Sequence, residues 1–322
     1  MSLLIADNVS RDFTVGPALG RKTLRAVTEV SLKVEKGQTL GLVGESGSGK
    51  TTLGRLMLGL LKPTRGAVRY DGKDLAALPA EQLRALRRHF QMVFQDPLAA
   101  LNPRVSVRDA VREPLEIHAP GLARAEQDAQ TAAMLERVGL PVALHGRMPT
   151  ALSGGQRQRA VIARALVAGP SLVVADEPVS ALDVSVQAQV VNLLADLKAE
   201  RGLAMLFISH DLGVVGHLAD AVAVLYLGRV VEQAPKTSLF AQPRHPYTQA
   251  LLSAAPSARR TGARIVLDGD PASPLAPPTG CAFHPRCPLF KTLDAAGQAR
   301  CRGEVPALRL LADAQVACHF AS

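Results

Sequence analysis

Short apolar runs alternate with segments of helical spacing through much of this chain. Apolar runs of strand length occur at Thr39–Val43, Leu172–Glu177 and Met205–Ser209. Runs dominated by apolar residues are typical of central strands in a parallel sheet, because both faces of such a sheet are covered. Two further segments, Thr51–Leu61 and Arg157–Leu166, keep apolar residues at helical spacing. The alternation predicts an α/β fold.

The pattern changes in two parts of the chain. From about residue 96 to residue 160 the composition becomes rich in Ala, Arg and Glu with helical spacing, which predicts an inserted helical arm. Outside this arm, Pro79–Arg88 predicts an exposed helix and Ala221–Val231 predicts a hairpin. We therefore divide the chain into an α/β domain, residues 1–240, and a C-terminal extension, residues 241–322, which contains all four cysteines.

A glycine-rich loop directly follows the first predicted central strand. Gly44–Thr51 has the pattern GxxxxGK[ST] between a strand and a helix, which is the context in which this pattern binds nucleotide. The glycines let backbone N–H groups point at phosphate oxygens, and the helix N-terminus adds its positive dipole end. Lys50 is predicted to reach the β- and γ-phosphates, and the Thr51 hydroxyl to hold Mg²⁺. The predicted ATP-binding residues of this phosphate loop are Gly44, Glu45, Ser46, Gly47, Ser48, Gly49, Lys50, Thr51 and Thr52.

Two acidic residues end the predicted strand Leu172–Glu177. Asp176 is placed to bind the Mg²⁺ ion through a water molecule. Glu177, one residue later, points elsewhere and could polarise a water molecule that attacks the bound nucleotide. An Asp-Glu-Pro sequence is also an ordinary exit from a strand into a loop. The position of this pair after the phosphate loop and just before Ser180–Asp183 favours the catalytic interpretation.

A second candidate anion site lies at Leu152–Gln156. Ser153 is a good helix N-cap, and Gly154 and Gly155 expose backbone N–H groups before a predicted helix. The N-terminus of that helix attracts anions as the phosphate loop does. One chain therefore carries two phosphate-recognition ends. With Gln156 included, this series of motifs resembles the ATP-binding cassette (ABC) family, in which this second motif is the signature motif.

The resemblance implies a fold and further roles. The fold is a P-loop NTPase (RecA-like) core with an antiparallel β subdomain, an inserted helical subdomain and a small cysteine-containing C-terminal extension. In this family the signature motif of one subunit caps the γ-phosphate held by the phosphate loop of another. Asp183 matches the loop between the two nucleotide sites, and Phe13 matches the aromatic residue that stacks on adenine, with a core phenylalanine as the alternative. The implied catalytic residues are Lys50, Gln95, Glu177 and His210, and the implied Mg²⁺ ligands are Thr51, Gln95 and Asp176.

The C-terminal extension resembles that of dipeptide and oligopeptide importer ATP-binding subunits. The resemblance is carried by His245–Leu252, by Gly280–Pro288 and by the later cysteines. It implies an iron–sulfur cluster on Cys281, Cys287, Cys301 and Cys318, and four thiolates are the number that a [4Fe–4S] cluster takes. Unliganded thiols and zinc are the alternatives, although the spacing lacks CxxC pairs. We predict that His245 and Tyr247 belong to a capped helix that docks the extension.

Charge and hydropathy restrict the classes of partner. The net charge is +9, but no lysine-rich tail and no basic patch interleaved with aromatic residues occurs, so we expect no nucleic-acid partner. No apolar run reaches about 18 residues, so we predict no membrane-spanning segment. The first residues lack a basic leader and a cleavage pattern, and they predict a first strand. We expect a peripheral protein on the cytoplasmic face of the inner membrane.

The resemblance implies an ATPase that powers peptide import as the nucleotide-binding subunit of an ABC transporter. The implied partners are two integral membrane permease subunits, an extracytoplasmic solute-binding protein and a second ATP-binding subunit, identical or related. An importer of nickel or glycosides is the nearest alternative. A soluble ABC ATPase and an iron–sulfur redox sensor are alternatives of other classes. The single cassette without heptad repeats disfavours the soluble class.

Overall fold

A computed structural model describes residues 2–17, 20–254 and 264–322 of the chain. The described residues fall into two units. The first unit comprises Val34–Gln38 and Ala77–Ile208, and the second comprises Ser2–Lys33, Thr39–Ala76 and Ser209–Ser322. Each unit brings together segments that are distant in the sequence.

The first unit is built on parallel strands. β6 (Phe90–Val93) pairs with β7 (Leu172–Asp176), and β7 pairs with β8 (Ala204–Ser209), both in parallel. Every residue of β7 and β8 is buried, as predicted for central strands. Parallel neighbours need long crossover connections, and helices supply them here.

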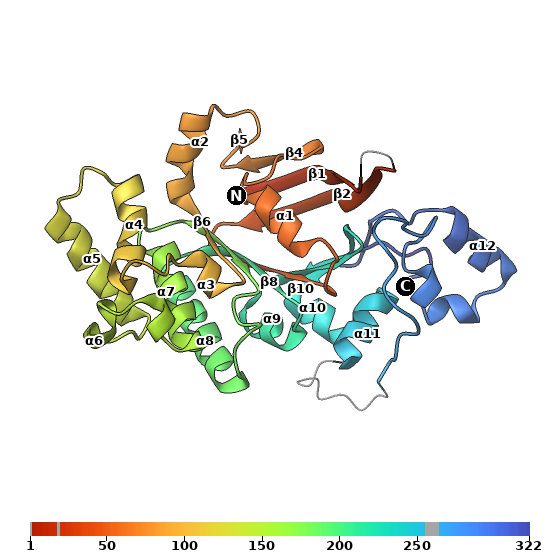
Figure 1. Ribbon diagram of the computed structural model, residues 1–322. Helices are drawn as coiled ribbons and strands as arrows, with labels where there is room; N and C mark the ends of the chain where they lie inside the picture. The colour runs from red at the N-terminus through yellow and green to blue at the C-terminus, as the bar shows by residue number, and fades with distance from the viewer. Residues whose placement is uncertain (1, 18–19, 255–263) are drawn as a thin grey trace. The chain divides into compact units, whose positions relative to one another are not determined.

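Helices make up most of the first unit. They are α2 (Ala80–Leu86), α3 (Pro97–Ala100), α4 (Val107–His118), α5 (Arg124–Arg137), α6 (Val142–His145), α7 (Gly154–Leu166) and α8 (Val184–Arg201). In Figure 1, α4, α5 and α7 lie side by side, and they contact one another. The block predicted to be helical thus holds α3 to α7. Helix α2 buries none of its residues, as predicted for an exposed helix.

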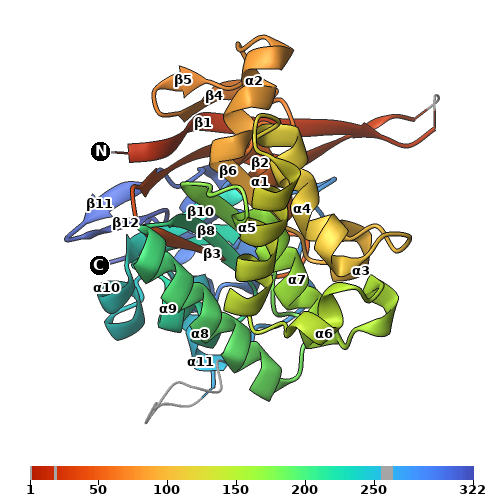
Figure 2. The same ribbon diagram turned by 90° about the vertical axis from the view of Figure 1, so that its left-hand side faces the viewer.

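The second unit contains two groups of strands. The first group has the order β2-β1-β4-β5, which Figure 2 shows. In the second group β3 pairs with β9 in parallel, and β9, β10, β12 and β11 continue antiparallel. The strands are β1 (Ser2–Val15), β2 (Lys22–Glu35), β3 (Thr39–Val43), β4 (Arg65–Tyr70), β5 (Lys73–Asp74), β9 (Ala221–Tyr226), β10 (Arg229–Pro235), β11 (Arg309–Leu311) and β12 (Ala314–Val316). The predicted first strand and the predicted hairpin, β9 with β10, are both confirmed.

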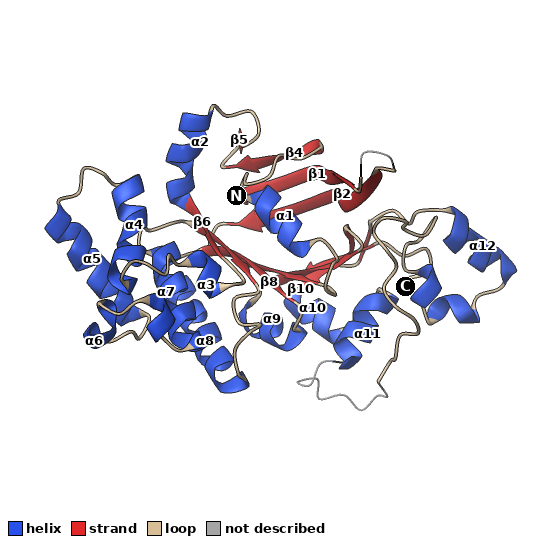
Figure 3. Ribbon diagram, in the orientation of Figure 1, coloured by secondary structure: helices blue, strands red, loops and turns tan. Residues whose placement is uncertain are grey.

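The helices of the second unit are short. They are α1 (Lys50–Met57), α9 (Leu212–Leu218), α10 (Lys236–Ala241), α11 (Pro246–Ala254) and α12 (Ala295–Gly303). Residues 264–322 run mostly as loop (Figure 3). Phe283 in this part and Tyr247 in α11 are buried, and with Tyr226 they form a cluster of rings whose centroids lie 4.8–5.3 Å apart. Aromatic burial therefore supplies much of the core of this extension.

One predicted helix end is wrong. The spacing predicts a helix over Thr51–Leu61, but α1 ends at Met57. Gly59 takes a left-handed φ of 62°, and the N–H groups of Leu60 and Leu61 both donate to the carbonyl oxygen of Arg55. A left-handed glycine with such bonds ends a helix, so the later leucines continue the apolar spacing outside it.

Within the described parts of the chain, no helix combines the length and apolar character needed to cross a bilayer.

Candidate functional site

The phosphate loop joins β3 to α1 within the second unit. A Cβ at Gly44 would lie 2.2 Å from the carbonyl oxygen of Leu225, and a Cβ at Gly49 would lie 2.2 Å from that of Ala26. Close backbone approach therefore requires glycine at both positions, and Gly49 also takes a φ of 100°. The hydroxyl of Ser48 is buried and has no hydrogen-bond partner among the described residues. Because buried polar atoms normally have partners, this hydroxyl fits a loop that receives a polar ligand.

Lys50 begins α1 and reaches back across the phosphate loop. Its side chain is buried, and Nζ donates at 2.8 Å to the carbonyl oxygens of Gly44 and Glu45. These bonds fix the ammonium group beside a helix N-terminus, where the helix dipole also favours an anion. Thr51 and Thr52 follow in the first turn of α1. The loop therefore gathers a cation, hydroxyls and backbone N–H groups, which is the chemistry that holds a polyphosphate.

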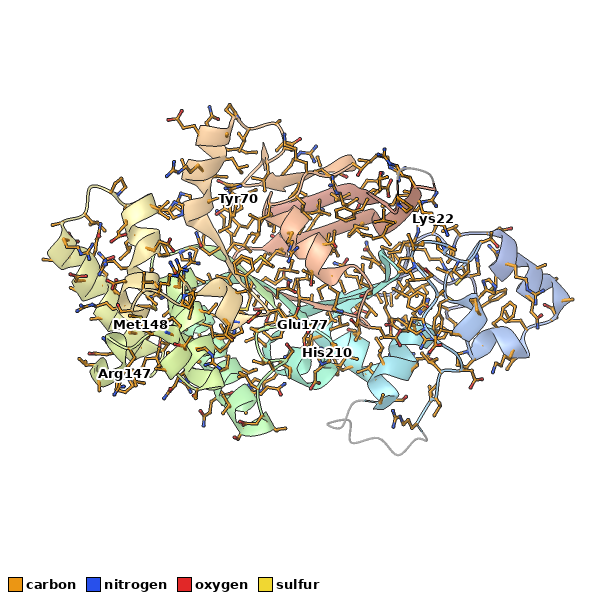
Figure 4. The ribbon with its side chains drawn as sticks, in the orientation of Figure 1. Lys22, Tyr70, Arg147, Met148, Glu177 and His210 are labelled. Carbon is orange, nitrogen blue, oxygen red and sulfur yellow. The ribbon has the colours of Figure 1, made fainter. Side chains whose placement is uncertain are left out.

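His210 and Phe13 also belong to the second unit. His210 follows β8 and is exposed (Figure 4). The next residue, Asp211, caps α9 by accepting from the N–H of Gly213 at 2.7 Å, which fixes the turn. Phe13 in β1 is half-buried, with the Arg11 guanidinium 4.7 Å from its ring centroid. Phe13 is therefore not a core residue, and its stacking on adenine stays a prediction.

Gln95 and Glu177 meet in the first unit. The side-chain nitrogen of Gln95 donates to a carboxylate oxygen of Glu177 at 3.1 Å. Glu177 directly follows β7 (Figure 4) and has a left-handed φ of 45°, and its N–H donates to the carbonyl oxygen of Ile208 at 3.0 Å. A left-handed residue other than glycine is strained and persists only where its surroundings hold it. Asp176, which is buried, ends β7. The structure thus places the predicted water-polarising carboxylate in contact with the predicted glutamine.

The signature motif begins α7 with a capping box. The Ser153 hydroxyl accepts from the N–H of Gln156 at 3.3 Å, and the Gln156 side chain accepts from the N–H of Ser153 at 3.0 Å. Asp183 caps α8 by accepting from the N–H of Val186 at 3.0 Å, and that bond, with the Ser185 hydroxyl, lowers the pKa of Asp183. Ser153 and Asp183 therefore stand at the starts of two helices of the same unit.

We expect Gly154→Ala and Gly155→Ala to have different effects on stability. A Cβ at Gly155 would lie 2.5 Å from a methyl group of Val186, a β-branched side chain with little rotamer freedom, whereas one at Gly154 would lie 3.7 Å from Leu182. Gly155→Ala should therefore lower the free energy of unfolding by about 1–3 kcal/mol. Gly154→Ala should leave it nearly unchanged. Urea unfolding of both variants checks this, and equal losses would contradict the contact with Val186 as the reason for glycine.

Glu45 receives contacts that the sequence did not predict. Its N–H donates to the Tyr247 hydroxyl at 2.9 Å, and its carboxylate accepts from the Arg286 guanidinium at 2.8 and 3.1 Å. Within the second unit, these bonds therefore hold the C-terminal extension against the phosphate loop. Separations of 202 and 241 residues leave no local pattern, so spacing and periodicity could not reveal these contacts.

His245 fixes the start of α11. Its Nδ1 accepts from the N–H of Tyr247 at 3.0 Å, and its own N–H donates to the Glu232 carboxylate at 2.9 Å. All three residues are buried, and burial lowers the pKa of His245 to about 3. The predicted capped helix that docks the extension is confirmed.

We expect acid to destabilise the protein through His245. The pKa of an unfolded histidine is about 6.5, so between that pH and about 3 the unfolded chain binds a proton that the folded chain does not. The contribution of His245 is complete above pH 6.5 and falls by up to about 1.4 kcal/mol for each pH unit below it. In His245→Asn an amide oxygen can accept the same N–H without titrating. Urea unfolding at pH 7 and pH 5 should therefore show a smaller loss in the variant, and equal losses would contradict the assignment.

The four cysteines line one small cavity, of about 20 Å³, in the second unit. Burial raises the pKa of Cys281 to about 12 and that of Cys287 to about 11, and it also raises the pKa of Cys301. The donor set fits an iron–sulfur cluster. The arrangement is not that of a metal site, because no three His, Cys, Asp or Glu side chains in the described ranges are placed to hold an ion.

Two segments of the chain match known protein families. Residues 27–180 match the family described as ABC transporter, and residues 231–292 match the family described as oligopeptide/dipeptide transporter, C-terminal region. The first segment contains the phosphate loop, Gln95, the signature motif and the Asp176–Glu177 pair. The second contains His245, Tyr247, Arg286 and the first two cysteines.

Several curated relatives are similar over most of their length. The probable peptide ABC transporter ATP-binding protein y4tS of Sinorhizobium fredii is 52% identical over 92% of this chain and 82% of its own. The oligopeptide transport ATP-binding protein AppF of Bacillus subtilis is 49% identical over 93% of this chain and 90% of its own. The di/tripeptide transport ATP-binding protein DppF of Pseudomonas aeruginosa is 46% identical over 99% of this chain and 98% of its own.

Solved structures are similar over the cassette. A dimeric ATP-binding cassette in a post-hydrolysis state, bound to ADP and Pi, has a TM-score of 0.67 and 29% identity, over 72% of this chain and 98% of its own. The cassette cbiO1 of Clostridium perfringens has a TM-score of 0.65 and 27% identity, over 75% of this chain and 91% of its own.

Proposed function

This chain belongs to the ATP-binding cassette family of peptide transporter subunits, and we propose that it hydrolyses ATP to drive the import of dipeptides or oligopeptides. The observation that carries this function is the presence, in one chain, of an ABC cassette and a peptide-transporter C-terminal region. The second match favours peptide import over a soluble ABC ATPase. The names of the relatives favour peptides over nickel or glycosides.

ATP is the substrate that the phosphate loop suits. We assign Lys50 and the backbone N–H groups of the loop to the β- and γ-phosphates, as supported by the fixed ammonium group and the buried Ser48 hydroxyl. Mg²⁺, when bound, supplies charge neutralisation to the phosphates, and we assign Thr51, Gln95 and Asp176 to hold it. Phe13 is assigned to the adenine ring.

Hydrolysis needs a water molecule that is oriented towards the γ-phosphorus. We assign Glu177 to accept a proton from this water as its oxygen bonds to the γ-phosphorus and the P–O bond to ADP breaks. We assign Gln95 to hold the Glu177 carboxylate in place, as their hydrogen bond supports. His210, exposed after β8, is assigned to the γ-phosphate. These roles leave positioning and charge stabilisation as the main sources of catalysis.

We assign the signature motif to the nucleotide of a second ATP-binding subunit. The N-terminus of α7 is formed by Ser153, its N-cap, with Gly154, Gly155 and Gln156. Asp183 caps α8 in the same unit. In such a pair each ATP contacts both subunits, whereas ADP contacts only one. ATP therefore favours the closed dimer. The similar cassette bound to ADP and Pi is a dimer, which supports the pairing of two ATP-binding subunits.

Peptide import requires membrane partners. We assign the chain to the cytoplasmic face of the inner membrane, bound to two permease subunits that receive peptide from an extracytoplasmic binding protein. Purification of the intact complex through a tag on this chain, followed by mass spectrometry of the bound solute, tests the function. Peptides are expected to be bound, whereas a nickel chelate or a glycoside would contradict peptide import.

We also assign a [4Fe–4S] cluster to Cys281, Cys287, Cys301 and Cys318, which the convergence of these four thiols on one cavity supports. The thiols would have to lose protons, and the side chains around this cavity, which has room for about one water molecule, would have to move apart to admit the cluster. Anaerobic reconstitution with iron and sulfide, followed by iron analysis and absorption spectroscopy, tests this site. Iron retained by the native chain and lost in Cys301→Ser is expected, whereas no retained iron would contradict a cluster.

A further inference from the structure

The contacts of Glu45 with the C-terminal extension point to a function for that extension in the ATP site. We propose that Arg286 and Tyr247 are positioning residues that hold the phosphate loop in its nucleotide-binding conformation. The proposal rests on the assignment of ATP to the phosphate loop. It concerns residues of the extension that the mechanism above does not use.

Five hydrogen bonds between described residues meet at Glu45, and one of them joins the N–H of Ser48 to the Glu45 carbonyl oxygen at 3.2 Å within the loop. The Tyr247 hydroxyl accepts from its N–H at 2.9 Å, and two nitrogens of Arg286 donate to its two carboxylate oxygens at 2.8 and 3.1 Å. The carbonyl oxygen of Glu45 accepts from Lys50 Nζ at 2.8 Å. One residue of the loop thus connects the extension directly to the lysine assigned to the phosphates.

Tyr247 and Arg286, the two residues of the extension that contact Glu45, are held in place by packing and hydrogen bonds. Tyr247 is fully buried, with ring centroids of Tyr226 at 4.8 Å and Phe283 at 5.3 Å. Its backbone N–H donates to His245, so the residue is fixed at both ends. Arg286 is 9% exposed, and its two parallel bonds to Glu45 give the fork geometry that fixes a carboxylate most strongly.

Arg286 also changes the charge of the phosphate loop. Glu45 is the second residue of a loop that receives a polyphosphate, and an unpaired carboxylate there would repel it. The ion pair with Arg286 neutralises this charge and turns the carboxylate towards the extension. Tyr247 adds order to a glycine-rich loop that otherwise loses conformational freedom when nucleotide binds. The expected result is tighter binding of ATP by a preorganised, neutralised loop.

Binding of a fluorescent ATP analogue to the purified full chain with Mg²⁺ tests the proposal. Arg286→Gln should weaken affinity about tenfold, and Tyr247→Phe, which removes a single hydroxyl, should weaken it several-fold. The matched control is Arg300→Gln, because Arg300 in α12 pairs with Glu304, which caps that helix, and no bond of Arg300 to the loop occurs among the described residues. Circular dichroism and the melting temperature, measured on every variant, restrict the comparison to folded protein.

A double mutant separates positioning from a general loss of structure. If the unpaired carboxylate repels nucleotide, then Glu45→Gln in the Arg286→Gln background should restore much of the lost affinity. A merely structural role of Arg286 would lower the melting temperature and show no such recovery. Native affinity in both folded single variants, or no recovery in the double variant, would overturn the proposal.

The same assay distinguishes this proposal from the proposed function. Lys50→Met should nearly abolish binding whether or not the extension positions the loop. If the native chain binds no ATP, the assignment of the phosphate loop fails. If the native chain binds ATP, Lys50→Met does not and Arg286→Gln binds normally, only the positioning role fails.

Discussion

Replacement of Glu177 by Gln should lower the rate of ATP hydrolysis by about 10²- to 10⁴-fold while leaving ATP affinity nearly unchanged. The amide has the shape of the carboxylate, and its oxygen can still accept from the side-chain nitrogen of Gln95, which donates to Glu177 at 3.1 Å. The amide cannot take a proton from water. Steady-state hydrolysis and nucleotide binding, measured on the same preparation, check both halves of this expectation.

The matched control for Glu177→Gln is Glu200→Gln. Glu200 lies in the last turn of α8 and forms an exposed ion pair with Arg137, so the same chemical change there should leave hydrolysis unchanged. With ATP present, Glu177→Gln should also accumulate as a dimer on size-exclusion chromatography, because the γ-phosphate is no longer removed. Normal hydrolysis by Glu177→Gln would refute the role assigned to this carboxylate.

Local patterns predicted the elements that position the candidate site. The strand before the phosphate loop agrees residue for residue with β3, and Ser153 caps α7 as its residue type suggests. Both depend on interactions within a few residues, which sequence spacing records directly. The end of α1 was predicted wrongly because Leu60 and Leu61 continue the apolar spacing after Gly59 has turned the chain.

Contacts between distant segments could not be predicted in this way. Arg286 lies inside the cysteine motif, and its residue type alone does not indicate a carboxylate partner 241 residues earlier. The left-handed φ of Glu177 could not be predicted from residue propensity either, because a residue other than glycine adopts it only where its surroundings hold it. The roles assigned to the site residues stay predictions, which variants of single residues can separate.

Replacement of Lys50 by Met should lower ATP affinity by about 100-fold or more, because the charged hydrogen bonds to the phosphates are lost. Methionine keeps an unbranched apolar stem in a position that is only 4% exposed, so the core around α1 should remain filled. The carbonyl oxygens of Gly44 and Glu45 also lose a donor, so we expect a decrease of about 1–3 kcal/mol in the free energy of unfolding. Calorimetric titration with ATP and urea unfolding measure the two effects independently.

Lys62→Met is the matched control, since Lys62 is exposed beyond α1 and the same change there should alter neither quantity. Comparison with Glu177→Gln then separates two steps of one cycle. If Lys50 binds phosphate and Glu177 activates water, the first variant loses binding and the second loses only turnover. A Lys50→Met protein that binds ATP normally would place the phosphates elsewhere. The roles of Glu45, Arg286 and Tyr247 would then fail with it, because their effect on ATP acts through the loop that Lys50 closes.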